Sequence, residues 1–252
     1  MIIGDKDKSE AYALKVLKQD PDNSSALTIL AELYAAQGDT NNALVSIDHA
    51  IENTNNPAPV ILEKARLLVK ASKHDQALSV LESEITVLSE NHDAWELLGD
   101  LYEHSGNLEA SINAFANAIE LAPLHFHCHL RIAELCIQHD ELDKAMLYLD
   151  NAVKLQSDDD DSGKLQETLG NLFVARKQFD RAYKAYSNSI KLTPKNASLY
   201  FNAGLALKQL KDYSEAMLMF RKSVDIDPNN VSAHRQLAAV SALELISGDS
   251  IA

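Results

Sequence analysis

Apolar residues recur three and four positions apart along most of the chain, in segments of about a dozen residues. This spacing gives each segment one apolar face and predicts amphipathic helices. Short turns such as AQGDT (36–40) and HSGNL (104–108) join the segments. Prolines, which lack the N–H donor of a continuing helix, fall at the ends of segments, at positions 21, 123, 194 and 228. The pattern predicts an all-α protein built from antiparallel helix hairpins.

The hydrophobic pattern repeats with a fixed period. A small residue in the second half of each predicted hairpin returns every 34 residues, at Ala43, Ala77, Ser111 and Ala145. The next step, to Ala182, is 37 residues, and Ala216 follows after 34 more. The long step contains SDDDDSG (157–163), which indicates a three-residue insertion in a surface loop. A period of this length is typical of stacked helical repeats.

Two further positions follow the same period. A small residue in each first helix is expected to let the paired helix approach closely: Ala31, Ala65, Gly99, Ala133, Gly170 and Gly204. A large residue in each second helix is expected to fill the space between repeats: Ile47, Leu81, Phe115, Leu149, Tyr186 and Phe220.

The chain resembles the tetratricopeptide repeat family over about 230 of its 252 residues. The third repeat carries nearly the whole signature: Trp95, Leu98, Gly99, Tyr102, Gly106, Phe115, Ala118 and Pro123. The resemblance implies a right-handed α-solenoid of stacked antiparallel hairpins. Three residues depart from the pattern, since Lys64 and Glu84 replace apolar or small residues and Gln166 replaces a large one. We therefore expect the second repeat to pack less well.

The period predicts the following division of the chain: a partial repeat (second helix only) at 5–23, repeats at 24–57, 58–91, 92–125, 126–162 (with the acidic insert), 163–196 and 197–230, a C-terminal capping helix at 231–247 and a tail at 248–252. Because the first element resembles half a repeat, the chain is interpreted as a possible fragment of a longer repeat protein.

In such a solenoid the first helices line a concave groove, which is the usual binding face of these proteins. Polar residues that recur at groove positions predict a site for a peptide or protein partner: Glu32, Glu63, Arg66, Asp100, His127, Arg131, Glu134, Lys164, Asn171 and Asn202. The alternative is that these side chains are simply solvated.

One well-known family function is expected to be lost. Chaperone adaptors of this family clamp a C-terminal carboxylate with lysines, asparagines and an arginine. Asn171 and Asn202 match the asparagine positions, but Glu167, Ser232 and Gln236 replace the basic residues, with Arg235 adjacent. A carboxylate needs cationic donors to offset its desolvation, so this clamp is expected to be broken.

The segment VSAHRQLAAVSALELI (231–246) is apolar on more than one face. Leu237, Ala238 and Leu245 are expected to face the preceding repeat, and Val240, Leu243 and Ile246 to point away. Because a capping helix should be polar outside, a self-assembling structural protein that forms homo-oligomers through its terminal helices is the alternative function.

Composition limits the partners. The formal charge of −14 argues against nucleic acid and anionic membranes and favours basic partner segments. No apolar run approaches the roughly 20 residues of a membrane span, and the start MIIGDKDKSE lacks the features of a signal peptide. Two cysteines do not make a disulfide framework. A cytoplasmic protein is therefore expected.

HFHCHLRIAELCIQH (125–139) gathers four histidines and both cysteines, which resembles a metal site. The repeat register instead assigns Cys128, His129 and Cys136 to core positions, His125 to the turn between repeats and His127 to the groove. His129 and Cys136 are about 10.5 Å apart along a helix, too far to share one zinc ion. Asp158–Asp161 lack the spacing of a calcium loop, and the catalytic motifs GxGxxG, GxxxxGK[ST], GxSxG and HExxH are absent. No enzyme activity, metal or cofactor is expected, and the predicted function is a non-catalytic scaffold or adaptor.

Overall fold

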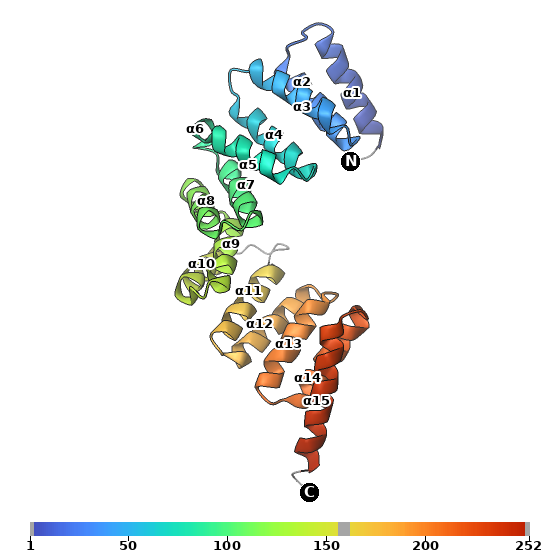
Figure 1. Ribbon diagram of the computed structural model, residues 1–252, viewed down its shortest axis with the longest axis vertical. Helices are drawn as coiled ribbons and strands as arrows, with labels where there is room; N and C mark the ends of the chain where they lie inside the picture. Colours follow the sequence, from blue (N-terminus) through green and yellow to red (C-terminus); the bar gives the residue numbers. More distant parts are fainter. Residues whose placement is uncertain (1–2, 156–161, 250–252) are drawn as a thin grey trace. The chain divides into compact units, whose positions relative to one another are not determined.

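The computed structural model describes the backbone of residues 3–155 and 162–249 (Figure 1), and side chains within 8–155 and 162–244. The described residues are α-helices joined by turns, as the apolar pattern predicts. They form two compact units, residues 1–123 and 124–252. The acidic run Asp158–Asp161 and residues 250–252 of the predicted tail lie outside the described residues.

The first unit contains α1 (Ile3–Leu17), α2 (Ser24–Ala36), α3 (Thr40–Glu52), α4 (Ala58–Lys70), α5 (His74–Ser83), α6 (Ile85–Leu88), α7 (His92–His104) and α8 (Leu108–Leu121). The second contains α9 (Phe126–Gln138), α10 (Leu142–Leu155), α11 (Ser162–Ala175), α12 (Phe179–Leu192), α13 (Ala197–Gln209), α14 (Tyr213–Ile226) and α15 (Val231–Asp249). The terminal helix therefore extends two residues beyond its predicted end, and α1 ends six residues before the predicted end of its segment.

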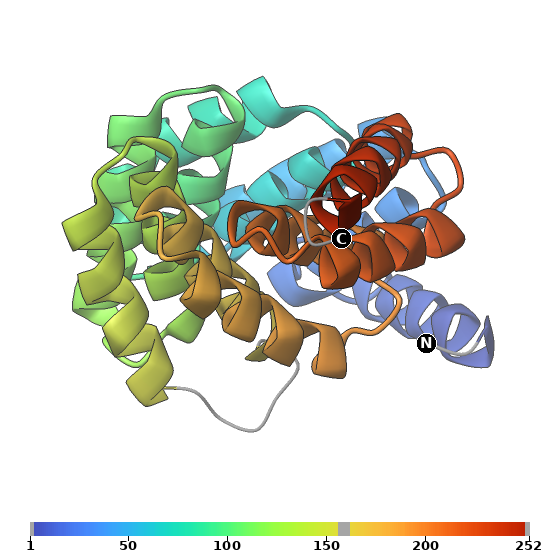
Figure 2. The same ribbon diagram turned by 90° about the horizontal axis from the view of Figure 1, so that it is seen from below.

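Consecutive helices pack in pairs: α2 with α3, α4 with α5, α7 with α8, α9 with α10, α11 with α12, and α13 with α14. Helix α15 lies alongside α14 in both views (Figures 1 and 2). Consecutive first helices also meet, since α2 contacts α4 and α9 contacts α11. Each of the six pairs named first falls within one predicted repeat, although the repeat boundaries themselves stay a prediction.

Each hairpin turns at a residue with positive φ, and this residue occupies the same place in all six: Gly38, Ser72, Gly106, Asp140, Lys177 and Lys211. Glycine adopts this conformation without strain, whereas side chains with a Cβ are disfavoured there. Asparagine and aspartate begin several of the helices, and their side-chain oxygens accept backbone N–H bonds at Ala26, Asn42, Ala94 and Ala110.

The hairpin core depends on a small residue in the first helix that lies under a large side chain of the second. A Cβ added to Gly99, Gly170 or Gly204 would lie 2.5–2.8 Å from the ring of Phe115, Tyr186 or Phe220, respectively. The other three hairpins have alanine at the small position and isoleucine or leucine opposite. All six large side chains are buried, as predicted. The large side chain of the second helix therefore fills the space that the small residue on the first helix leaves open.

The second hairpin departs from the others at Glu84. This position holds a buried alanine or serine in the five other hairpins, Ala50, Ala118, Ala152, Ser189 and Ser223. A carboxylate cannot be buried there without a large desolvation cost. The chain leaves the helical path after Ser83, keeps Glu84 half-buried, and resumes as the single turn α6, whose Leu88 is fully buried.

The predicted orientation of the terminal helix is right at Leu237 and wrong at Val240 and Ala238. Val240, expected to point away from the preceding hairpin, is fully buried in the core cluster that contains Phe220. Leu237 packs against the same cluster, while Ala238 is exposed. The helix is rotated so that Val240 rather than Ala238 faces the hairpin, because the larger side chain buries more apolar surface. The side chains of Leu245 and Ile246 lie outside the described residues.

Gly170→Ala tests the close packing of the hairpin. Its new Cβ would fall 2.5 Å from the Tyr186 ring, so we expect a loss of about 1–3 kcal/mol in the free energy of unfolding despite the better helix propensity of alanine. Gly163→Ala, in the same helix, is the matched control, because its Cβ would meet nothing closer than 3.4 Å. Urea denaturation followed by circular dichroism measures both. Equal effects of the two substitutions would contradict the packing account.

Candidate functional site

The ten predicted groove residues all lie on first helices. Glu32 is on α2, Glu63 and Arg66 are on α4, Asp100 is on α7, His127, Arg131 and Glu134 are on α9, Lys164 and Asn171 are on α11, and Asn202 is on α13. Each is exposed or half-buried. Asn171 and Glu134 also contact residues of the hairpins themselves, so the fold and this surface share these two side chains.

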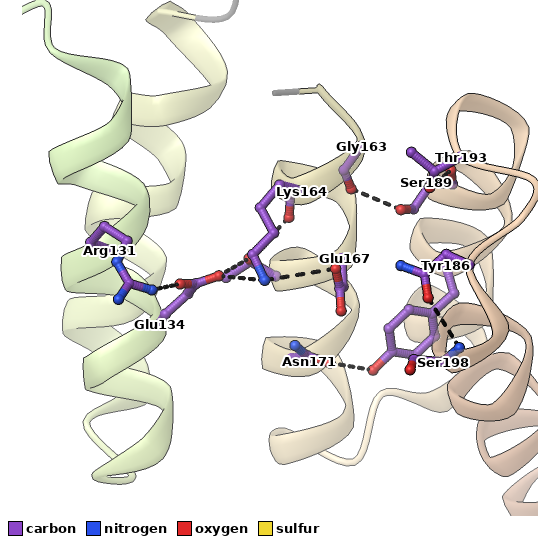
Figure 3. Close-up of polar contacts among 12 residues, drawn as sticks. Arg131, Glu134, Gly163, Lys164, Glu167, Asn171, Tyr186, Ser189, Thr193 and Ser198 are labelled. Carbon is purple, nitrogen blue, oxygen red and sulfur yellow. Dashed lines mark hydrogen bonds and ion pairs between the residues drawn. The ribbon is translucent and has the colours of Figure 1, made fainter. Parts of the chain in front are cut away.

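Between α9 and α11 the predicted residues form a network around Glu134 (Figure 3). Its carboxylate lies 2.6 Å from the Arg131 guanidinium, and it lies 3.0 Å from the Lys164 ammonium. The Thr168 hydroxyl also donates to Glu134, at 3.1 Å. Lys164 is 3.7 Å from Glu167 on its own helix. Because the Glu134 side chain is only 12% exposed, these donors satisfy a carboxylate that is largely removed from water.

The network changes the titration of Lys164. Burial alone would lower the pKa of this ammonium, but the charge and hydrogen bond of Glu134 outweigh burial, and the pKa is raised. The ion pair therefore stabilises the fold at neutral pH, and this contribution is lost only as the pH rises through the raised pKa of Lys164.

The hairpins of the first unit repeat this arrangement with the charges exchanged. Arg66 on α4 lies 3.1 Å from Asp93 on α7, and 4.0 Å from Glu63 on its own helix. Arg66 and Glu134 are both the ninth residue of a predicted repeat, and Asp93 and Lys164 are both the second residue of the next. The same pair of positions thus holds a cation and an anion in one unit and the reverse in the other.

Glu32 and Glu63 form an acidic pair on neighbouring first helices. Burial raises the pKa of the Glu63 carboxyl, and the negative charge of Glu32 raises it further, while Lys70 and Arg66 partly offset the shift. The Glu63 side chain is 18% exposed. The fold therefore disfavours the charged form of this carboxyl group.

The two asparagines differ in how strongly the fold holds them. The Tyr186 hydroxyl donates to the Asn171 side-chain oxygen at 2.7 Å (Figure 3). Burial, and then the charge of Glu167, raise the pKa of this tyrosine. Asn202 on α13 is half-buried. Gln236, which replaces one of the basic residues of the carboxylate clamp, accepts a hydrogen bond from Lys208 at 2.8 Å.

The sequence analysis omitted two residues that contact the predicted groove residues: Asp93, which is half-buried, and Thr168, which is fully buried. Both pair with predicted groove residues of the preceding hairpin. A signal was present for Asp93, because it occupies the repeat position of His127 and Lys164. Thr168 gave no such signal, since a single threonine within a helix is common without a role; here it is buried beneath Glu134 and donates to it.

The histidine and cysteine cluster has the predicted core positions. Cys128, His129 and Cys136 are all buried, and both thiols are free of disulfides. The His129 ring packs against Tyr148, with 5.9 Å between centroids. His125 precedes the first residue of α9 and His127 is half-buried.

Among the described residues, no helix is both long and apolar enough to cross a membrane.

Repeated hairpins with a variable polar face define a helical-repeat protein. Profiles described as tetratricopeptide repeats match residues 12–45, 62–123, 105–160 and 197–230, and one described as a TPR repeat matches 170–211. The chain belongs to the tetratricopeptide repeat family.

Individual proteins resemble it at low identity. The tetratricopeptide repeat-containing protein trd-1 of Caenorhabditis elegans is 24% identical over 157 residues, or 62% of this chain and 19% of that protein. BBSome complex member BBS4 of Bos taurus is 22% identical over 251 residues, which cover 95% of this chain and 48% of that protein. A chain in the crystal structure of the APC/C hetero-tetramer Cut9–Hcn1 superposes with a TM-score of 0.71 and 17% identity, covering 94% of this chain and 46% of that one. The chain thus spans half or less of the length of these proteins.

Glu63→Gln tests the acidic pair. Because the folded state raises the pKa of Glu63 above its ordinary 4.5, stability should fall as the pH rises through the raised pKa. The substitution should therefore increase the free energy of unfolding at neutral pH, and this gain should disappear below about pH 4. Urea denaturation at a series of pH values, with exposed Glu90→Gln as control, measures it. A gain that does not vary with pH would refute the explanation.

Glu134→Gln tests the network between α9 and α11. Removing the charge leaves Arg131 beside Lys164 without the carboxylate that satisfies both, so we expect a loss of about 1–2 kcal/mol in the free energy of unfolding. Glu141→Gln removes an exposed partner of Lys144 and should cost less than about 0.5 kcal/mol. Thermal or urea denaturation of the two variants measures the difference. A clearly larger loss for Glu134→Gln indicates a network, and equal losses would indicate a set of solvated charges.

Proposed function

We propose that the chain is a non-catalytic scaffold or adaptor that binds a basic segment of a partner protein along its first helices. The proposed binding residues are the ten groove residues named above together with Asp93. Proteins of this family generally act by binding other proteins. Two of its relatives are named as parts of assemblies, the BBSome complex and the Cut9–Hcn1 hetero-tetramer.

The acidic pair Glu32 and Glu63 is the observation that carries this proposal. Burial and the charge of Glu32 oppose the charge on Glu63 more than Lys70 and Arg66 favour it, so we expect a neutral residue at this position to make the chain more stable. Residues that lower stability in this way are typical of binding sites, where a ligand supplies what the fold lacks. A lysine or arginine from a partner would offset the repulsion, and the chain's net charge of −14 would attract it.

The paired charges have a different role in this proposal. Arg66 with Asp93, and Glu134 with Lys164 and Arg131, are already satisfied within the chain. Such pairs add little affinity, but they repel a wrongly placed partner and so determine the register in which a segment binds.

The alternative of self-assembly through the C-terminal helix rested on Val240, Leu243 and Ile246 as outward-facing apolar residues. Val240 is buried in the core of the preceding hairpin and Leu243 is half-buried, while the side chain of Ile246 lies outside the described residues. The surface of the first helices therefore supports a partner of another sequence better than a second copy of the chain.

The double variant Glu32→Gln with Glu63→Gln separates binding from stability. The partner is first identified by mass spectrometry after co-purification from the native source, and then purified. We expect the variant to unfold at the same or a higher temperature than the unmodified chain, yet to bind this partner about five- to tenfold more weakly, because two attractive charges are lost.

The control is Glu52→Gln with Glu109→Gln, which removes two exposed carboxylates from the second helices α3 and α8. It changes the net charge equally, so it should retain nearly full affinity in the same calorimetric titration. Unchanged binding by the groove variant, or an equal loss in both variants, would overturn the proposed surface.

A further inference from the structure

A pocket of about 450 Å³ lies in the first unit, among α5, α6, α7 and α8. Trp95, Leu98 and Tyr102 of α7 and Ile85 of α6 line it, with Glu82 of α5 and Asn113 of α8 among its polar residues. The volume is within the range of ligand pockets. None of the residues that line it is basic.

The pocket is separate from the proposed groove. On α7, Trp95, Leu98 and Tyr102 are spaced so that they share one face, and Asp93 and Asp100 share another. Asp93 and Trp95 are two positions apart, as are Asp100 and Tyr102, and two positions correspond to about 200° of rotation around a helix, so the two sets lie on nearly opposite faces. The pocket therefore opens on the side of the second helices, and a ligand there leaves the first-helix surface free.

The irregular second hairpin forms one wall of the pocket. Helix α5 ends at Ser83 because Glu84 cannot occupy the buried small position, and the chain then turns through α6. This turn places Ile85 against the aromatic residues of α7. The same departure from the repeat pattern that shortens α5 thus creates a wall that the regular hairpins lack.

Hydrogen bonds fix the two aromatic rings and a carboxylate around the pocket. The indole N–H of Trp95 donates to the Ser89 carbonyl oxygen at 2.9 Å. The Tyr102 hydroxyl donates to Glu82 Oε1 at 2.9 Å. Both rings are half-buried and Glu82 is exposed. Aromatic faces beside a carboxylate are the surroundings that a guanidinium prefers, because it can stack on a ring while donating to the carboxylate oxygens.

The chain around the pocket is strongly acidic. From His74 to Leu130 the sequence has no lysine or arginine, and it has ten carboxylates: Asp75, Glu82, Glu84, Glu90, Asp93, Glu96, Asp100, Glu103, Glu109 and Glu120. This segment therefore carries −10 of the net charge of −14. Such a field attracts cations and opposes anions.

We infer that this pocket is a second binding site, which accepts an arginine side chain presented by a partner polypeptide. The methylene groups of the arginine lie against Ile85 and Leu98, and the guanidinium stacks on an aromatic ring and donates to Glu82. Lysine fits less well, because its compact ammonium neither stacks on a ring nor forms two parallel hydrogen bonds.

The single tryptophan of the chain provides the test, because Trp95 lines the pocket and its fluorescence reports on this site alone. The probe is N-acetylarginine amide, with N-acetylcitrulline amide as a neutral analogue of nearly the same shape. We expect a saturable fluorescence change with the arginine probe at concentrations up to about 50 mM, and at least about threefold weaker binding of the citrulline probe.

Glu82→Gln should weaken the arginine probe roughly three- to tenfold and leave the citrulline probe unchanged. Glu120→Gln, an exposed carboxylate on α8 that does not line the pocket, should change the affinity less than about twofold. The inference is overturned by the absence of a saturable change, by equal binding of the two probes, which would indicate an apolar occupant, or by equal effects of the two variants. Glu32→Gln with Glu63→Gln should bind the probe normally, so failure here leaves the proposed groove function intact.

Discussion

The contact between a small residue of each first helix and a large side chain of its partner determines the spacing of every hairpin. Where the small residue is glycine, as at Gly99, an aromatic ring occupies the position of the missing Cβ. Where it is alanine, as at Ala133, the opposite residue is aliphatic and fully buried. Interiors are close-packed, so this exchange of volume fills the space between the two helices while the sequence varies. The opposite face of each first helix is consequently free to vary.

That face holds charges that differ from hairpin to hairpin. Arg66 with Asp93 and Glu134 with Lys164 occupy equivalent positions with opposite signs. The exposed pair of Arg66 and Asp93 contributes at most about 1 kcal/mol to stability, and the more buried network of Glu134 contributes somewhat more, so the core supplies most of what holds the hairpins together. A surface of this kind suits recognition, because its charges can change without changing the fold.

Much of the fold could be predicted from the sequence because the period repeats the same information six times. The large and small positions, the core placement of Cys128, His129 and Cys136, and the first-helix location of the groove residues all follow from register alone. The orientation of α15 did not, since a terminal helix has no following repeat to define its buried face. The pairing of Asp93 and Thr168 with groove residues also depends on side-chain conformations between neighbouring hairpins. The pocket beside Trp95 arises from a break in the period, which a periodic pattern cannot describe.

The central claim is that a partner binds the first helices and leaves the second helices uncovered in the regular hairpins. Photo-crosslinking within one hairpin tests it most directly, with p-benzoylphenylalanine placed at Asn202 of α13 or, in a second variant, at the exposed Leu218 of α14. The co-purified partner should crosslink to position 202 and not to position 218. Crosslinking at 218 alone, or equally at both positions, would contradict the account.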